Sequence, residues 1–378
     1  MTAPTKDARL HDVYRHAGPF VTVWLDATRS TESGAHEVEL RWDAVKGHLA
    51  PEVKPELLDR VWAAIDGDRT PGRHGLLIVA ADDEVLLIEP LRDPPATSTG
   101  SVAALPRLMP YLADRSQDIP HVVVVADRTG ADVLAVSASG ATASQSVTGG
   151  AEYPVHRTGR DDWSERHFQL RVENTWEANA KDVAEAVRRQ VDDIAARLVI
   201  VAGDVRARQM IADDLGTNHG FGVRAIEEGG RAAGSSPAAL ERAVRDEVLR
   251  EIWHERRDVL VHLQQNLGRK EYAVAGVQAV VDALRSAQAD TVVLSDDPSS
   301  TITAWIGPEP SQFGLDDSEA QAFGLIGVEH TRFDSALVRA IVGSGASLLV
   351  TPGAHDYLDG GIGALLRFDP SARAERGA

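Results

Sequence analysis

The chain has 378 residues, a hydrophobic content of 43% and a formal net charge of −18 at pH 7. At about 100–200 residues per domain, this length predicts two or three domains, and the absence of cysteine excludes disulfides, thiolate chemistry and the commonest structural zinc sites. No run of about 18 apolar residues indicates a membrane span, and no secretory signal pattern opens the chain, so we expect a cytoplasmic protein.

The acidic charge also bears on partners. Taken alone, it argues against nucleic acid, because binding to phosphates is driven largely by Lys and Arg. The alternative is that an acidic composition rich in alanine and arginine reflects the proteome of the source organism. Any RNA-facing region must therefore stand out as a local basic surface.

Residues 1–116 predict an N-terminal α/β domain. Alternation in Phe20–Asp26 places Val21, Val23 and Leu25 on one face of a strand. Two helices and a hairpin that turns at Asp82-Asp83 are predicted to follow. The helices are predicted over Glu37–Leu49 and Pro55–Ile65, and the hairpin strands over Gly75–Ala80 and Glu84–Pro90.

Residues 117–230 predict a middle α/β domain. A strand, His121–Asp127, leads through a Thr-Gly turn to a second strand. A Gly/Ser/Thr-rich connector, SGATASQSVTGG, then precedes a long amphipathic helix, and a buried strand, Arg197–Asp204, and a helix, Val205–Leu215, follow it. Steps of three and four draw the apolar stripe of the long helix: Phe168, Val172, Trp176, Ala180, Val183, Val187, Val191 and Ile194.

Residues 235–378 predict a third α/β domain, after a linker-like stretch, EEGGRAAGSSP. Ser236 is predicted to cap a helix that begins at Pro237 and runs to about Gln265. The later elements are predicted as helix Val274–Ala287, strand Thr291–Asp297, helix Asp334–Gly343 and strand Ala346–Gly353. The fold class is therefore α/β, as three consecutive small domains.

The start of the long helix concentrates positive charge in an acidic chain. The candidate RNA-binding residues of this tip are His156, Arg157, Arg160, Trp163, Arg166, His167 and Arg171. Arginine can grip phosphate with two hydrogen bonds, and a tryptophan stacked on a base contributes roughly 1–3 kcal/mol. The alternative is structural: Asp161 and Asp162 cap the helix, and Trp163 is a hydrophobic staple.

Several motifs in order give the chain a family resemblance. HVVVVADRTGADVLAV, ERHFQLRVENTWEANAKDVAEAV and LVIVAGD, with ASLLVTPGAHDYLDGGIGALLRF near the end, resemble the archaeal and eukaryotic class-one release factor and Pelota family in its bacterial branch. His167-Phe168, Arg171-Val172-Glu173 and Val183-Ala184-Glu185 are similar to the family's helix motifs. The resemblance covers the whole chain, is closest to Balon-like ribosome hibernation factors, and implies an RNase H-like middle domain and an L7Ae-like C-terminal domain.

The resemblance implies binding in the ribosomal A site together with elongation factor Tu. The first domain would face the decoding centre and the third the elongation factor. Hydrolytic family members carry Gly-Gly-Gln at the tip, but the matching place here is Gly159–Ser164, and no glutamine lies between Thr148 and Phe168. The codon-reading Asn-Ile-Lys-Ser motif is also absent from the corresponding region, Ala27–Ala35. We therefore expect neither codon reading nor peptide release.

Two further basic regions are weaker candidates. Arg29, Arg41 and Lys46 are possible RNA contacts of the first domain, or else part of a solvated helix face with Trp42 in the core. Near the start of the third domain, arginines at 242, 245, 250, 256 and 257 alternate with acidic residues. Such spacing is typical of surface ion pairs that contribute little, with a protein-binding surface as the alternative.

Enzymatic interpretations find less support. Asp127, Asp132 and Asp204 lie at predicted strand ends, where carboxylates can bind Mg²⁺ but more often begin turns. A P-loop is missing, which argues against GTPase activity. We expect no catalytic residue, metal or cofactor, the ribosome and elongation factor Tu as partners, and no DNA or membrane binding. The alternatives are a peptidyl-tRNA hydrolase in ribosome rescue and a stress-related scaffold without ribosome binding.

Overall fold

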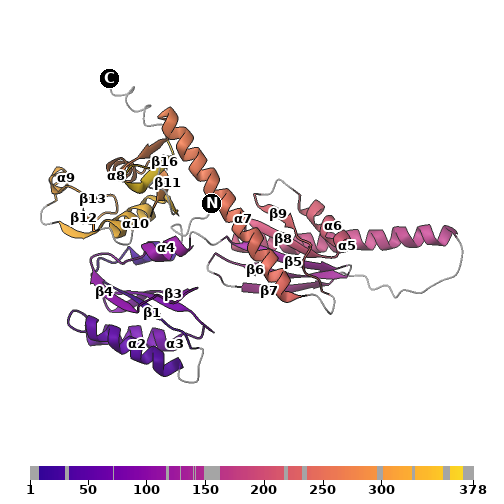
Figure 1. The fold of residues 1–378 in the computed structure, drawn as a ribbon, viewed down its shortest axis with the longest axis horizontal. Helices are drawn as coiled ribbons and strands as arrows, with labels where there is room; N and C mark the ends of the chain where they lie inside the picture. Colours follow the sequence, from indigo (N-terminus) through magenta and orange to yellow (C-terminus); the bar gives the residue numbers. More distant parts are fainter. Residues whose placement is uncertain are drawn as a thin grey trace. The chain divides into compact units, whose positions relative to one another are not determined.

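The computed structural model describes residues 8–29, 34–70, 72–115, 119–127, 129–138, 140, 142–148, 162–216, 220–231, 236–295, 301–325, 328–351 and 358–368, with residues 162–176 as backbone only. Over these residues the fold is mixed α/β, as predicted (Figure 1). Contacts group the chain into two compact units, residues 1–116 with 260–378, and residues 117–259. This grouping into two units does not test the division into three domains, which stays a prediction.

The N-terminal part of the first unit is a four-stranded antiparallel sheet, in the order β3-β2-β1-β4, with helices on both faces. Val21, Val23 and Leu25 alternate onto one face, as predicted, and pack against α2 and α3. Figure 1 shows these two helices on one side of the sheet. Pro55 begins α3, where its missing N–H costs no helix hydrogen bond. The elements are α1 Ala8–Val13, β1 Phe20–Asp26, α2 Gly34–Leu49, α3 Pro55–Gly67, β2 Gly75–Ala81, β3 Glu84–Leu91, β4 Thr99–Ala103 and α4 Met109–Arg115.

The C-terminal part of this unit has two sheets, in the orders β10-β16-β11-β15 and β13-β12-β14. Leu337 and Ile341 of α10 are fully buried in one core with Phe20 of β1 and Leu112 of α4, so residues 1–116 and 260–378 share that core. The elements are β10 Ala273–Ala275, α8 Val277–Arg285, β11 Ala289–Leu294, β12 Thr303–Ile306, β13 Phe313–Gly314, α9 Asp317–Ala322, β14 Glu329–Arg332, α10 Phe333–Ser344, β15 Ser347–Val350, the 3₁₀ turn η3 Asp359–Gly361 and β16 Ile362–Leu366.

The second unit is a five-stranded mixed sheet in the order β7-β6-β5-β8-β9. β5 pairs antiparallel with β6 and parallel with β8, which requires the crossover that α5 supplies. Ala180, Val183, Val187 and Val191 of the predicted stripe are buried between α5 and the sheet. The elements are β5 His121–Asp127, β6 Gly130–Val136, β7 Thr142–Thr148, α5 Asp162–Ile194, β8 Leu198–Gly203, α6 Val205–Leu215, β9 Gly222–Ala225 and α7 Pro237–Arg269, whose last turns belong to the first unit.

Two predicted elements are wrong in detail. The polar connector after β6 contains the edge strand β7, whose side chains are mostly exposed and therefore lack hydrophobic alternation. The predicted helix at Val274 begins instead with the short strand β10, which pairs with β16, and α8 starts at Val277. Among the described helices, none has both the length and the apolar character needed to cross a membrane.

Candidate functional site

The predicted RNA-binding tip falls largely outside the described residues. His156, Arg157 and Arg160 lie outside them altogether. Trp163, Arg166, His167 and Arg171 lie in the first half of α5, which begins at Asp162, but only their backbone is described. RNA binding by the tip therefore stays a prediction. The structure adds that the backbone of four of its seven positions is helical.

The second half of α5 is fixed on its sheet by small and β-branched side chains. Val183 and Val187 are fully or almost fully buried and Ala184 is fully buried, beside Val122 and Val124 of β5. At 1.5 Å per residue, the 33 residues of α5 span about 50 Å. Figure 1 shows its first half extending past the strands of its own sheet. The helix thus holds the backbone of the four tip positions that lie in it, Trp163, Arg166, His167 and Arg171, away from the core of this unit.

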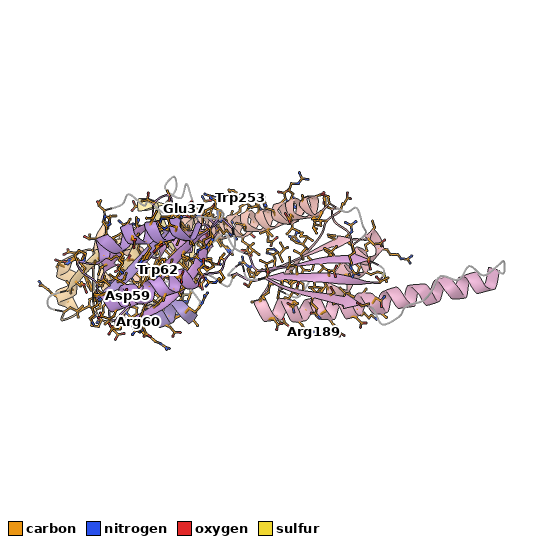
Figure 2. The ribbon with its side chains drawn as sticks, turned by 90° about the horizontal axis from the view of Figure 1, so that it is seen from below. Glu37, Asp59, Arg60, Trp62, Arg189 and Trp253 are labelled. Carbon is orange, nitrogen blue, oxygen red and sulfur yellow. The ribbon has the colours of Figure 1, made fainter. Side chains whose placement is uncertain are left out.

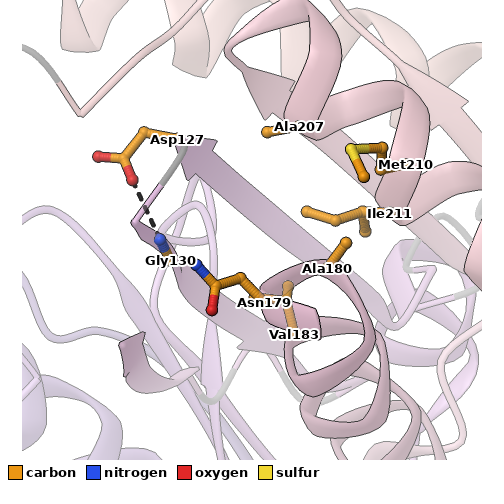
Figure 3. Close-up of a pocket in the computed structure, with 8 residues that line it drawn as sticks. All are labelled: Asp127, Gly130, Asn179, Ala180, Val183, Ala207, Met210 and Ile211. Atoms are coloured by element: carbon orange, nitrogen blue, oxygen red, sulfur yellow. Dashed lines mark hydrogen bonds between the residues drawn. The ribbon is translucent and has the colours of Figure 1, made fainter. Parts of the chain in front are cut away.

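The end of β5 approaches α5 and α6 around a small cavity (Figure 3). Its volume is about 20 Å³, enough for one water molecule at most. Asp127 Oδ1 accepts hydrogen bonds from the backbone N–H groups of Thr129 and Gly130, at 2.7 and 3.1 Å, and so closes the β5–β6 turn. The cavity is lined by Asp127, Gly130, Asn179, Ala180, Val183, Ala207, Met210 and Ile211. A space of this size and lining does not fit a small-molecule ligand.

The carboxylates considered as metal ligands are engaged by protein donors. Arg231 Nη1 lies 3.1 Å from Asp127 Oδ1, and Arg231 Nε lies 3.1 Å from Asp132 Oδ2. Asp204 caps α6 by accepting from the N–H groups of Arg206 and Ala207. Among the described residues, no group of three or more His, Cys, Asp or Glu is placed to hold a metal ion. These aspartates are explained by turn, cap and ion-pair roles.

Hydrogen bonding also sets the charge of Asp127. Burial alone raises the pKa of its carboxyl, but the hydrogen bonds from Thr129 and Arg231, with the positive charge of Arg231, lower the pKa overall. The carboxylate is therefore held in its charged form, which the arginine neutralises locally.

The predicted cations of the N-terminal part hold structural partners. Arg29 donates from Nη1 to the Asp68 carbonyl at 2.8 Å and from Nη2 to the Ile65 carbonyl at 2.9 Å, at the C-terminal end of α3. Arg41 Nη2 lies 3.2 Å from Glu37 Oε2 and Nε 3.5 Å from Asp26 Oδ2. An RNA ligand must compete with these acceptors for Arg29 and Arg41.

Lys46 is held in the same way. Its Nζ lies 3.4 Å from Oδ1 of Asp59, which is labelled in Figure 2, and the two side chains are 39% and 72% exposed. Trp42, between Arg41 and Lys46 in sequence, is buried as the structural alternative predicts and stacks on Trp62 with ring centroids 6.5 Å apart. Arg29, Arg41 and Lys46 thus lie on or beside helices α2 and α3. Their contact with RNA stays a prediction.

A larger cavity lies within the first unit. Its volume is about 500 Å³, and Tyr14, His16, Ile306, Glu329 and Arg339 are among its lining residues. The Arg339 guanidinium donates from Nη1 to the Gly307 carbonyl at 2.8 Å and also bonds the Pro308 carbonyl, so it ties down the cavity wall. Because Arg339 and Glu329 carry opposite charges, the lining of the cavity favours neither an anionic nor a cationic ligand.

Sequence reasoning missed one exposed aromatic residue. Trp253 of α7, labelled in Figure 2, is 68% exposed, and Leu249, one turn earlier, is 46% exposed. A signal for this pair exists in the sequence, because Arg242, Leu249, Trp253 and Arg257 recur at helical spacing. The direction in which that row faces depends on contacts from other elements, which the sequence pattern does not contain.

Two known proteins are similar to this chain over nearly its whole length. They are uncharacterized proteins of Mycobacterium tuberculosis, Rv2629 of strain ATCC 25618 / H37Rv and MT2704 of strain CDC 1551 / Oshkosh. Each is 27% identical over 372 residues, which is 97% of this chain and 98% of theirs.

Solved structures with similar folds include Saccharomyces cerevisiae Dom34, a translation termination-like factor, at 10% identity and a TM-score of 0.41, covering 95% of this chain and 92% of that one. A ribosome-bound archaeal Pelota has 14% identity and a TM-score of 0.40, covering 98% and 96%. Residues 120–269 match the family model described as bacterial archaeo-eukaryotic release factor family 2. This segment therefore carries the sequence pattern of that family, in agreement with the release-factor resemblance predicted from the sequence.

Proposed function

We propose that this protein is a non-catalytic ribosome-binding factor that occupies the A site, together with elongation factor Tu, during hibernation or stress. The observation that carries the proposal is the match of residues 120–269 to a bacterial release-factor family. That segment runs from just before β5 to the end of α7, so it includes the whole five-stranded sheet and α5. The expected mode of action is steric, because an occupied A site cannot accept tRNA.

The geometry of α5 supports a role in which the middle segment extends its tip toward a binding partner. Its second half is buried on the sheet from Ala180 to Val191, which fixes the direction of the helix. Its first half runs beyond the strands and carries the tip positions Trp163 and Arg166 (Figure 1). A rigid helix of this length suits a protein that inserts basic and aromatic groups into irregular RNA.

The sequence of the tip supports binding without hydrolysis. Peptide release by the hydrolytic release factors that the chain resembles depends on a glutamine at the tip, and none lies between Thr148 and Phe168. Gln169 falls inside α5, past its first two turns, which is a poor place for a group that must position water at an ester. We therefore assign the tip a binding role and no catalytic one.

Co-sedimentation with purified, tRNA-free ribosomes tests the proposal. The full chain is compared with Arg160→Ala/Trp163→Ala/Arg166→Ala, with and without elongation factor Tu, at about 50 and 200 mM salt. We expect binding that weakens with salt, increases with the elongation factor and is lost in the tip variant. The matched control, Arg60→Ala/Arg189→Ala, removes two exposed arginines elsewhere and is expected to bind like the parent chain (Figure 2).

Two outcomes contradict the proposal in different parts. Failure of the parent chain to sediment with ribosomes under every condition rejects ribosome binding and favours the scaffold alternative, which the charge of −18 also favours. Release of peptide from a stalled ribosome complex by the purified chain rejects the non-catalytic assignment and favours a rescue hydrolase.

A further inference from the structure

The first half of α7 has a fixed orientation within the second unit. Ile252 is 7% exposed and packs against Leu198 and Ile200 of β8. Val244 and Val248 approach the same cluster. Because these residues anchor one side of the helix, the opposite side faces away from the sheet.

Because one side of α7 is anchored on the sheet, its charged side chains divide between the side that faces its own unit and the outward side. Glu251 Oε2 lies 3.0 Å from Arg224 Nη2, and Glu255 Oε2 lies 2.8 Å from Arg197 Nη2, so both acids turn toward elements of their own unit. Their side chains are only 18% and 28% exposed. These are ion pairs between elements, whereas the sequence suggested pairs along the helix. They remove negative charge from the outward side of α7.

The outward side carries a small excess of positive charge, although the exposed acids Glu241 and Asp258 lie beside its ends. Steps of four, three, four and four residues join Arg242, Asp246, Leu249, Trp253 and Arg257 into one exposed row. Exposed arginines at positions 245 and 250 flank this row, and Arg250 bonds Glu247. Within the described part of the chain, Arg257 takes part in no ion pair. With two arginines and one aspartate, this strip has a net charge of +1 in a protein of net charge −18.

Leu249 and Trp253 place apolar surface in the middle of that strip. Exposed fractions of 46% and 68% leave much of both side chains in water. Single exposed apolar residues are common, but an indole framed by guanidinium groups combines the two groups that bind unpaired RNA: cations for phosphate and a flat face for a base.

We propose that the outward row of α7, from Arg242 to Arg257, binds irregular or single-stranded RNA, with Trp253 stacked on a base and the arginines on phosphates. The inference rests on the proposed function, since the ribosome supplies such RNA. It adds a contact surface outside the predicted tip. The chemistry of this row favours RNA over an acidic protein. Its arginines are separated from one another around a single stacking side chain, and it has no continuous apolar stripe of the kind that fills a groove on a protein partner.

A direct binding measurement with the full chain tests this surface. The probe is a fluorescein-labelled single-stranded RNA of about 12 nucleotides, read by anisotropy at about 50 and 200 mM salt. Arg242→Glu/Arg257→Glu is compared with Arg60→Glu/Arg189→Glu, which changes the net charge equally at exposed sites elsewhere (Figure 2). We expect the α7 variant to weaken binding by at least about tenfold relative to that control.

Trp253→Ala isolates the stacking contribution. We expect a roughly tenfold loss of RNA affinity with no change in the salt slope, because the indole carries no charge. Leu249→Ala is the matched truncation of the neighbouring apolar residue and is expected to lose less. A labelled poly-glutamate peptide serves as the acidic-protein probe, and peptide binding as tight as that of RNA overturns the proposal.

The outcomes separate this inference from the proposed function. RNA affinity of Arg242→Glu/Arg257→Glu equal to that of its control rejects the α7 surface, even where the parent chain sediments with ribosomes. Loss of RNA binding confined to the α7 variants supports the surface, even where ribosome binding fails. A tip variant that alone abolishes oligonucleotide binding rejects α7 as the RNA contact and leaves the proposed function in place.

Discussion

His74 and Asp68 form a buried pair in the loop between α3 and β2. His74 Nε2 lies 2.7 Å from Asp68 Oδ2, and its Nδ1 lies 3.1 Å from the Gly72 carbonyl oxygen. Their side chains are 4% and 9% exposed. Both ring nitrogens of His74 therefore lie beside oxygen atoms, one of the Asp68 carboxylate and one of the Gly72 backbone carbonyl.

Acid is expected to weaken this loop. Burial by itself raises the pKa of Asp68, but hydrogen bonds from Thr70 and His74 outweigh it and lower the pKa overall. A carboxyl with a lowered folded-state pKa stabilises the fold above its unfolded value of about 3.9 and loses that contribution as pH falls below it. Urea unfolding at decreasing pH is expected to show falling stability, and Asp68→Asn is expected to flatten that dependence.

Asp59→Asn provides the control for Asp68. Asp59 is 72% exposed and pairs only with Lys46 among the described residues, so its loss is expected to cost less than about 1 kcal/mol. An acid dependence of Asp68→Asn as steep as that of the parent chain would falsify the role assigned to the buried pair.

Two tyrosines of the first unit, each with a buried hydroxyl group, are expected to respond differently to loss of that hydroxyl. Within the described residues, the Tyr14 hydroxyl is buried and has no hydrogen-bond partner, and burial raises its pKa. Tyr111 donates to Glu89 Oε2 at 3.0 Å, and Glu89 is 1% exposed. Tyr111→Phe is expected to lower the free energy of unfolding by about 1–3 kcal/mol, whereas Tyr14→Phe is expected to be neutral or stabilising. Equal destabilisation in urea titrations of the two variants contradicts this assignment.

Local patterns predict the elements whose determinants are local. The helix Val205–Leu215, the Asp82 turn and the alternation of β1 are each set within a few residues, and the structure confirms them. Strand β7 was missed because its exposed polar residues pair through the backbone, which leaves no hydrophobic signal. The core that joins Phe20 to Leu337 depends on contacts between positions more than 300 residues apart, which the order of successive elements does not reveal.

The candidate site likewise has a part that the sequence predicts and a part that depends on the folded chain. The tip of α5 was predicted from composition and family resemblance, and its side chains lie outside the described part of the chain. The partners of Arg29 and Lys46, by contrast, come from α3 and its C-terminal end, and only the folded chain brings them together. The outward direction of Trp253 likewise follows from the bonds of Glu251 and Glu255 to other elements, so spacing along α7 was not enough to identify it.

Glycine is required where β8 meets α6. Gly203 has a φ of +109°, and a Cβ there would lie 1.9 Å from the Ala126 carbonyl oxygen. Because neither backbone can retreat without breaking the β5–β8 pairing, Gly203→Ala is expected to cost at least about 2 kcal/mol. Gly47 is exposed inside α2, and a Cβ there would meet no atom within 4 Å beyond the backbone of its own helix, so Gly47→Ala is expected to gain up to about 1 kcal/mol. Thermal unfolding of both variants checks the contrast, which fails if Gly203→Ala is tolerated.

The Asp127 turn is expected to depend on its backbone bonds more than on its ion pair. Asp127 Oδ1 accepts from Thr129 N–H and Oγ1–H, each at 2.7 Å, whereas Arg231 reaches a carboxylate that is 36% exposed. Asp127→Ala is therefore expected to lower the free energy of unfolding by about 1–2 kcal/mol, and Arg231→Ala by less than about 1 kcal/mol. Denaturant unfolding of the second unit's residues, followed by hydrogen exchange in the full chain, measures both. A cost for Arg231→Ala equal to or above that of Asp127→Ala would show that the ion pair, and not the turn, holds the end of β5.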